Sequence, residues 1–539
     1  MGALALDGPN GPPIESASQM LGLFAGRLGA RLGDWQLRLQ LNPESMGGIE
    51  REIQASFAEG AGMITAGLMA AVLAGKELAE SCERTRREYS YPLARGRNRT
   101  MMIRLLGGFV MWATSLYCEP RRGLFRKPRD KRPGVHVELE QFGFAKGITP
   151  GVESQVARQA ALTPSLELAR TELARQGLNL DFKVVRRVTY QCGDDLLKLR
   201  TLRLQQWRAG ELVAGDELAG KRITVQIDGG RTRLRSEMRE KPAVGEAVDA
   251  DGLIVENAPG RSRPRGRRTF DAPWREPRLV TVFEHDEQGR MVENSRATID
   301  GTFQGPDAIA ELVAMHLHRL GAAMAQSITF ACDGAPWIWD RVGWIVKAAG
   351  IGPEVTIHEV LDCCHAVHHV SLALKEYGLN ERERMPLYRQ HRTLLRNGQW
   401  RRVVQELQEL LDESHCHAGT MQREIDYLRK HGEAGRMSYP HFRSLGLPLG
   451  SGAIESSIRR VINQRLKSNS MFWREAGAEC MLQLRALLVS DRWDEHIAAK
   501  QAMRRKTRLP DWHWTPNPCC GPPEASSVNV ETTKKTTKT

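Results

Sequence analysis

Hydrophobic residues follow a helical period in two long stretches in the first part of this chain. Residues 15–85 and 152–207 carry apolar positions three and four residues apart, which predicts helices. Between these stretches, two runs with the composition of strands, 101–106 (MMIRLL) and 109–117 (FVMWATSLY), flank Gly107-Gly108. Two strand-like runs joined by a glycine pair predict a β-hairpin.

From residue 223 the pattern changes to short buried strands that alternate with helices. Ile309, Val313, Leu317 and Leu320 fall on one face of an expected helix. The expected strands are 223–230, 279–285, 291–298, 328–335 and 355–362. From residue 375 to about 445 the chain is polar, rich in Arg, Glu, Gln and Leu, and has no strand pattern. The sequence therefore predicts an α/β region that an all-helical segment interrupts.

Residues 450–473 (GSGAIESSIRRVINQRLKSNSMFW) begin with a glycine-rich turn and then predict one long helix. The apolar positions that share one side of this helix are Ile454, Ile458, Val461, Ile462 and Leu466. Glu455 lies inside that apolar arc, so we expect it to point inward. A buried unpaired carboxylate is costly, and it needs either an arginine such as Arg459 or a metal ion shared with other carboxylates.

Composition indicates a soluble chain of several domains with a polyanionic partner. Its residues are 41% hydrophobic and 26% charged, which is typical of soluble globular proteins. A chain of 539 residues is too long for a single hydrophobic core. The net charge of +13 favours nucleic acid first and an acidic membrane surface second. The ten cysteines form no C-x-x-C pair, which favours reduced thiols in the cytoplasm. We expect no signal peptide in residues 1–14, a buried helix and no membrane span in residues 60–75, and a disordered tail from Arg504.

Residues 166–188 resemble a helix-turn-helix. A first helix with Leu166, Ala169 and Leu173 on one face is followed by a break at 177–181, in which Asp181 is a candidate N-cap. In the second helix we expect Phe182, Val185 and Val188 inward and Lys183, Arg186 and Arg187 outward. Any two packed helices produce part of this pattern, but in a basic chain we favour DNA binding. The basic segment 121–132 is either a solvated loop or a DNA contact.

Two matched strands carry the candidate chemistry. ITVQIDG (223–229) and ITFACDG (328–334) each end in an aspartate at the carboxyl edge, where ligand sites of α/β sheets gather. If the strands are neighbours, Asp228 and Asp333 share a pocket, and Glu455 is the natural third carboxylate. Such a group repels itself unless a cation holds it, and oxygen ligands suit Mg²⁺ or Mn²⁺. The alternative is two ordinary Asp-Gly turns with Glu455 paired to Arg459.

The order strand–Asp, strand–Asp, helix–Glu resembles the DDE transposases of bacterial insertion sequences, above all their Mutator-like branch. The three acids lie in matching segments: Asp228 in VQIDGG, Asp333 in ACDGAPWIW and Glu455 in residues 450–473. Asp362-Cys-Cys-His365 is similar to the C/D-x-x-H element of that branch, and residues 274–289 resemble its second strand. The resemblance covers about residues 215–495. It implies an α/β RNase H-like catalytic core, a mixed sheet flanked by helices, with an all-α insertion that lengthens the spacing between Asp333 and Glu455.

The resemblance also implies chemistry and partners. Asp228, Asp333 and Glu455 would hold two Mg²⁺ or Mn²⁺ ions for an in-line phosphoryl displacement, first by water and then by a freed 3′-hydroxyl. His365 would position a phosphate or the scissile strand, or else pack its helix. Arg459, Arg460, Arg465 and Lys467 would hold DNA phosphates. A zinc site formed by His368, His369 or the His415-Cys416-His417 group with Cys363 or Cys364 is the less favoured reading, because its spacing is not standard.

We therefore expect a transposase that cleaves insertion-sequence ends and transfers them into target DNA. Its partners would be double-stranded DNA with terminal inverted repeats and further copies of itself, as a homodimer or higher oligomer, in the bacterial cytoplasm at the nucleoid. The alternatives are an RNase H-like nuclease without strand transfer and a DNA-binding regulator on an inactive scaffold. The expected segments are an N-terminal helical region with a hairpin (1–130), a helix-turn-helix region (131–212), a core in two parts (213–374 and 449–500), a helical insertion (375–448) and a tail (501–539).

Overall fold

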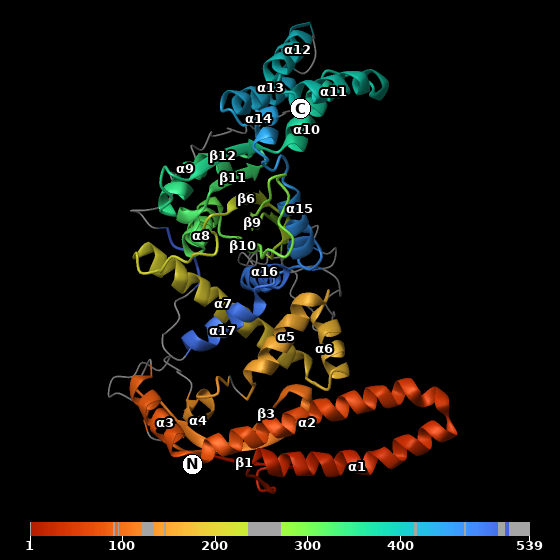
Figure 1. Cartoon of the computed structure of the whole chain (residues 1–539), viewed down its shortest axis with the longest axis vertical. Helices are drawn as coiled ribbons and strands as arrows, with labels where there is room; N and C mark the ends of the chain where they lie inside the picture. The colour runs from red at the N-terminus through yellow and green to blue at the C-terminus, as the bar shows by residue number, and fades with distance from the viewer. Residues whose placement is uncertain are drawn as a thin grey trace, which may run out of the picture. The chain divides into compact units, whose positions relative to one another are not determined.

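A computed structural model describes residues 2–89, 92–94, 96–120, 134–144, 147–235, 271–413, 418–467, 471–504 and 512–516. The chain forms two compact units, Met1–Leu202 with Trp493–Trp512, and Arg203–Arg492 with His513–Thr539. Figure 1 labels their helices and strands. The basic segment 121–132, the His415-Cys416-His417 group and most of the tail lie outside the described residues.

The first unit contains a helical hairpin and an antiparallel sheet. The helices are α1 (Ala17–Leu41), α2 (Met46–Ala74) and α3 (Lys76–Glu88). The sheet has the order β2-β1-β4-β3, with β5 also paired to β4. Its strands are β1 (Ala3–Ala5), β2 (Pro13–Ile14), β3 (Arg97–Arg104), β4 (Val110–Cys118) and β5 (Val135–His136). The predicted hairpin is confirmed as β3 and β4, and Gly107 and Gly108 in its turn have φ of 77° and 86°, which glycine adopts without strain.

The apolar helix of this unit contributes to its core. By length and composition alone the stretch Pro43–Ala74 is able to cross a membrane, a test that core helices also pass, and 44% of its most apolar window is buried. Met63, Ala66 and Ala70 of α2 pack with Ile103 and Met111 of the hairpin. This packing supports the prediction of a buried helix.

A three-helix group follows in the same unit. It consists of α5 (Pro150–Leu162), α6 (Leu166–Arg175) and the part of α7 (Phe182–Arg208) that ends at Leu202. Thr149 and Ser165 cap α5 and α6, and the Asp181 carboxylate accepts a hydrogen bond from the Lys183 amide at 2.7 Å. Val185 and Val188 are buried as predicted.

Phe182 differs from the prediction, because its side chain is 38% exposed. Leu178 and Leu180 of the preceding turn enter the core of this helix group instead. The first turn of α7 therefore faces solvent, and Lys183, Arg186 and Arg187 are exposed there. Exposure permits the proposed DNA contacts but does not test them.

The second unit is built on a mixed five-stranded sheet of order β10-β9-β6-β11-β12. β9 pairs antiparallel with both β10 and β6, whereas β6, β11 and β12 are parallel. The strands are β6 (Arg222–Gly229), β9 (Arg278–Glu284), β10 (Thr298–Thr302), β11 (Ser327–Cys332) and β12 (Thr356–Leu361). A separate two-stranded ribbon pairs β7 (Thr232–Arg233) with β8 (Trp274–Arg275). The coarse prediction of a mixed sheet flanked by helices is confirmed.

One strand prediction was wrong in position. We expected a strand at 291–298, but β10 begins at Thr298. Residues 291–297 instead continue the turn after β9, where Asn294 has φ of 63° and the Ser295 amide donates to the Val292 carbonyl. A residue with positive φ interrupts extended backbone, so the strand starts only after it.

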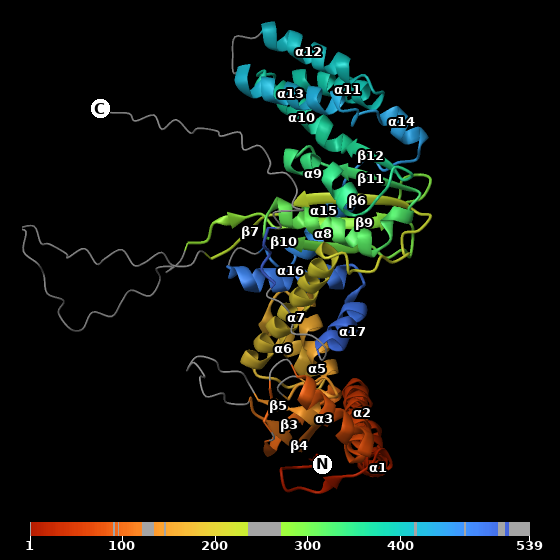
Figure 2. The ribbon, with the colours of Figure 1, turned by 90° about the vertical axis from the view of Figure 1, so that its left-hand side faces the viewer.

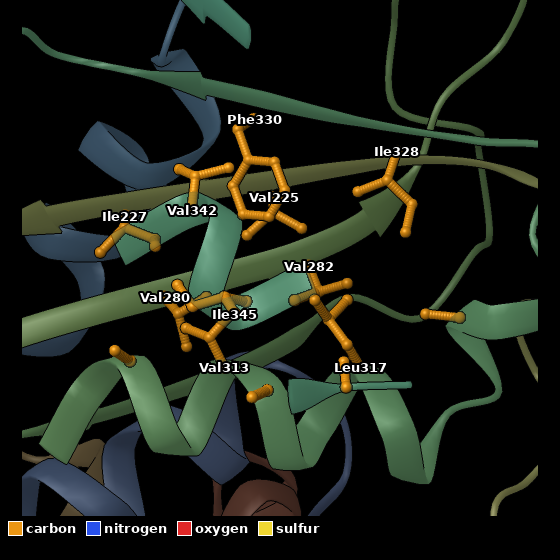
Figure 3. Packing of buried hydrophobic residues seen from close by; sticks show 14 of the residues in the cluster. Val225, Ile227, Val280, Val282, Val313, Leu317, Ile328, Phe330, Val342 and Ile345 are labelled. Carbon is orange, nitrogen blue, oxygen red and sulfur yellow. The ribbon is translucent and has the colours of Figure 1, made fainter. Parts of the chain in front are cut away.

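The main core lies between the sheet and two helices, α8 (Pro306–Arg319) and α9 (Pro336–Ala348). Figure 3 shows Val313 and Leu317 of α8 directed at Val280 and Val282 of β9. Ile223, Val225 and Ile227 of β6 belong to the same core. Because side chains alternate along a strand, Gln226 and Asp228 project from the opposite face.

The opposite face of the sheet holds α15 (Gly452–Ile458), and α16 (Glu475–Val489) packs next to it (Figure 1). The single long helix predicted for 450–473 is wrong. The α-helix ends at Ile458, Arg459–Asn463 forms a π-helical turn, and the chain then leaves the helix. The Arg485 guanidinium donates to the Arg460 carbonyl and, at 3.2 Å, to the Gln464 side chain. A side chain that enters the backbone ladder ends regular helix geometry.

The region between β12 and α15 is helical, as its polar pattern predicts. Its helices are α10 (Cys363–Glu376), α11 (Glu381–Arg396), α12 (Trp400–Glu413), α13 (Ala418–Glu433) and α14 (Tyr439–Ser444). They share a core with Val360 and Leu361 of β12. Figure 2 shows them stacked beyond the β12 edge of the sheet.

Candidate active site

Asp228 and Asp333 leave the sheet side by side. β6 and β11 are parallel neighbours, and Val225 pairs with Phe330, an offset of 330 − 225 = 105. The two aspartates have the same offset, 333 − 228 = 105, three residues further along each strand. Parallel strands with this register bring both carboxylates to one edge of the sheet, as the sequence predicted.

Both aspartates are partly buried, and among the described residues neither forms an ion pair with an arginine or a lysine. Burial, followed by the neighbouring Asp333 carboxylate, raises the pKa of Asp228 to about 6. Burial also raises the pKa of Asp333. Each accepts one local amide hydrogen bond, from Gly229 at 2.6 Å and from Ala335 at 3.1 Å. Within the described ranges no arginine or lysine forms an ion pair with either carboxylate, so a bound cation would relieve their repulsion.

Asp362 and His365 lie beside this pair at the start of α10. Asp362 is the N-cap of that helix, and its Oδ1 accepts the amides of Cys364 and His365. Its Oδ2 accepts the Ser451 hydroxyl at 2.6 Å. Although burial alone would raise it, the pKa of Asp362 is held well below its usual range by His365 and Ser451. The Asp362 carboxylate in turn raises the pKa of His365, whose Nδ1 lies 3.5 Å away.

Glu455 is exposed, and the prediction of an inward-facing carboxylate is therefore wrong. The Glu455 carboxylate faces Asp362 and His365 and not the core. Its Oε1 lies 3.3 Å from the Ser451 hydroxyl. Ligand atoms of Glu455, Asp362 and His365 lie within 4.8 Å of one another. Arg459, the alternative partner, forms no ion pair with Glu455 in the part of the chain that the structure describes.

The five side chains form two adjoining groups. Asp228 and Asp333 make one, and Asp362, His365 and Glu455 make the other. His365 joins them, because its imidazole interacts electrostatically with Asp228 and Asp333 as well as with Asp362. The sequence predicted one pocket of three acids with His365 as a further site residue; the structure places Glu455 with Asp362 and His365, and it places His365 within electrostatic reach of Asp228 and Asp333.

Gln226 holds α15 in this place. Its side-chain amide donates to the Gly450 carbonyl and its oxygen accepts the Ile454 amide, both at 2.9 Å. Thr281 of β9 adds a hydrogen bond of 3.1 Å to Ser457. Sequence reasoning missed Gln226, although a polar residue inside a buried strand was a usable signal, since such a group needs a partner.

The donor set fits a hard divalent cation. Four carboxylates and an imidazole surround one edge of the sheet, and the unpaired, partly buried Asp228 and Asp333 have raised pKa values that a cation would lower. Oxygen-rich sites of this kind suit Mg²⁺ or Mn²⁺. Among the described residues, the group with ligand atoms close enough for one ion is Asp362, His365 and Glu455, and Asp228 and Asp333 adjoin it through His365.

Helix α13 covers the turn that carries Asp333. A Cβ on Gly334 would lie 2.0 Å from the Tyr427 hydroxyl, so only glycine fits. The Tyr427 ring stacks on His369 with 3.5 Å between centroids, and His369 Nδ1 lies 2.5 Å from Glu424. This pairing gives His369 a partner other than zinc. No local pattern indicated Tyr427, because its role depends on how the helical region packs against the sheet.

Replacing Gly334 with alanine is expected to lower the activity of this site by displacing Asp333. The double variant Gly334→Ala/Tyr427→Ala removes the hydroxyl that the new methyl group meets, and it should recover most of the loss. Tyr427→Ala alone is the control. The measurement is metal-dependent DNA cleavage at equal protein concentration. Equal activity in the single and double variants would show that Tyr427 does not determine the position of Asp333.

The basic residues after Glu455 divide into two kinds. Arg459, Arg460 and Lys467 are exposed, in keeping with the predicted phosphate contacts. Arg465 is 3% exposed, and its guanidinium lies 5.1 Å from the centroid of the Trp473 ring. Its assignment as a DNA contact is therefore wrong in this conformation, because a buried arginine cannot reach a phosphate in solvent.

Comparisons with known proteins leave the family open. No family model matches the chain, and no curated protein matches it. One similar solved structure is the "Drosophila P element transposase strand transfer complex", at 9% identity and a TM-score of 0.29. The alignment covers 67% of this chain and 95% of the chain in that structure.

Proposed function

We propose that this protein is a DDE-type transposase with an RNase H-like catalytic domain, of the Mutator-like kind. The observation that carries the proposal is the placement of Asp228 and Asp333 at equal height on neighbouring parallel strands, with Glu455 on a helix that Gln226 fastens to the same strand. The sheet order, three antiparallel strands followed by two parallel ones, supports it. The helices between β12 and α15 would be the insertion of that branch.

Each residue has a role in this proposal. Divalent cations bound to the carboxylates would activate the attacking oxygen and stabilise the leaving oxygen of an in-line phosphoryl displacement. Asp228 and Asp333 would bind them from the sheet and Glu455 from α15. Asp362 would orient His365 and Ser451, and His365, whose pKa Asp362 raises, would contact the phosphate being attacked. Arg459, Arg460 and Lys467 would hold the flanking backbone.

The rest of the protein would bring the DNA to this site. Lys183, Arg186 and Arg187 on the exposed start of α7 would contact double-stranded DNA at the element ends. Cleavage of two ends requires two sites, so we propose a homodimer or higher oligomer, acting at the nucleoid of a bacterial cytoplasm. These statements rest on the proposed chemistry.

The test uses the full-length protein, Mg²⁺ and DNA that contains the sequences on both sides of its coding region. A transposase cuts at defined ends and joins the 3′-hydroxyl to a target plasmid, which gel electrophoresis and junction sequencing detect. Cleavage without joining would instead identify the nuclease. Binding without cleavage would identify the regulator, a function that does not explain why the carboxylates are all present.

A further inference from the structure

A cavity of about 780 Å³ lies beside the carboxylates, between α10, α11, α14 and the turn before α15. Three of its lining side chains are arginines, Arg392 and Arg396 of α11 and Arg443 of α14. Cys364 and Leu449 line it as well, and Tyr388 supplies an aromatic ring. We call it the arginine cavity. Its volume is that of a site for a small organic ligand.

The arginines have no carboxylate partner among the described residues. On the neighbouring helices α12 and α13, by contrast, Arg402 pairs with Glu406 at 2.7 Å and Arg429 with Asp426 at 2.7 Å. Arg392 and Arg396 are exposed and form no ion pair with the described acids, while Arg443 donates to the Arg396 carbonyl. Three guanidinium groups around one concavity give it a positive lining that attracts an anion.

The cavity and the carboxylates adjoin. Gly450 lines the cavity and precedes Ser451, and a Cβ on Gly450 would lie 3.6 Å from Asp362 Oδ2. Cys364 lies within electrostatic reach of both groups, because its thiol interacts with Asp362 and Glu455 as well as with Arg392 and Arg396. A chain of phosphates that passes Glu455 therefore meets these arginines next.

We propose that the arginine cavity binds one nucleotide of the DNA strand adjacent to the scissile phosphate, with its phosphate on Arg392 and Arg396 and its base against Tyr388 and Leu449. This inference rests on the proposed function and adds a subsite to it. Guanidinium groups form paired hydrogen bonds with phosphate oxygens. An aromatic ring next to an apolar side chain stacks on any base. The cavity would therefore accept a nucleotide with any base, provided that the nucleotide lies outside the double helix.

Salt-dependent binding tests the phosphate contacts. The double variant Arg392→Ala/Arg396→Ala is compared with Arg382→Ala/Arg389→Ala, which removes two arginines of the same helix outside the cavity lining. We expect only the first variant to weaken binding of fluorescent DNA with a single-stranded end. The slope of log K against log salt should fall by about 1.4, from two contacts at roughly 0.7 each. Equal slopes in the two variants would overturn the proposal.

Alkylation of Cys364 tests the location. This exposed thiol lines the cavity, and its rate of reaction with N-ethylmaleimide, followed by peptide mass spectrometry, should fall several-fold when saturating DNA with a single-stranded end is present. Blunt duplex should protect it less. Equal protection by a nucleoside monophosphate would assign the cavity to a free nucleotide and overturn the strand assignment. No protection by any of these would overturn the site.

The two hypotheses fail separately. If the wild type cleaves and joins DNA but Cys364 remains unprotected, the arginine cavity is wrong and the transposase assignment stands. If DNA protects Cys364 but no cleavage occurs with Mg²⁺ or Mn²⁺, the cavity stands as a strand-binding site and the assigned reaction is wrong.

Discussion

Replacing Asp333 with asparagine is expected to abolish metal-dependent cleavage and joining, by about 10³-fold or more. Asparagine keeps the volume of the side chain but removes the charge that balances a divalent cation beside the attacked phosphate. Asp228→Asn should have the same effect, because the two carboxylates leave neighbouring strands at equal height. The measurement is the rate of product formation on a gel, with DNA binding measured separately.

Asp340→Asn is the matched control, since Asp340 is exposed on α9 close in sequence to Asp333. It should leave both steps unchanged. DNA affinity without metal should also be unchanged in Asp333→Asn, which separates loss of chemistry from loss of binding. Joining that survives in Asp228→Asn or Asp333→Asn would remove the basis of the proposed mechanism.

Without metal, Asp228→Asn is expected to stabilise the second unit at pH 7 to 8. Burial and the neighbouring Asp333 carboxylate raise the pKa of Asp228 to about 6 in the folded protein, so the folded state binds this proton more tightly than the unfolded state does. Its contribution to stability is therefore present below about pH 4 and lost as the pH rises through 6. After allowance for solvent screening, the ionised carboxylate costs on the order of 1 to 2 kcal/mol at neutral pH, which the asparagine removes.

Magnesium should offset the loss of stability that the ionised Asp228 carboxylate causes. At pH 7.5 we expect MgCl₂ to raise the unfolding temperature of the wild type more than KCl of equal ionic strength does. The gain should shrink at pH 5, where protons compete for Asp228, and it should be much smaller in Asp228→Asn. Thermal unfolding followed by circular dichroism measures all these quantities. A destabilised Asp228→Asn variant, or an equal response to both salts, would argue against a cation site at this pair.

The local patterns of the chain were sufficient for most of the elements. Alternation in residues 223–229 and 328–334 predicted two buried strands, and the aspartates at their ends follow because strand-ending acids are a local feature. The hairpin around Gly107-Gly108 and the helical region after β12 were predicted for the same reason. The strand at 291–298 and the long helix from 450 were wrong, because Asn294 and Arg485 interrupt those patterns through backbone conformation and a distant side chain.

By itself the sequence determined which residues carry the candidate chemistry, since Asp228, Asp333 and Glu455 can be read from strand and helix periodicity together with a family resemblance. Only the tertiary structure decided how they meet. Gln226 and Ile454 are 228 residues apart, and their hydrogen bond docks α15 so that Glu455 faces Asp362 and His365 instead of the core. Tyr427 over Gly334 and the three arginines beside Cys364 are likewise contacts between distant segments. Periodicity records which face of an element is apolar, but it does not record which element covers that face.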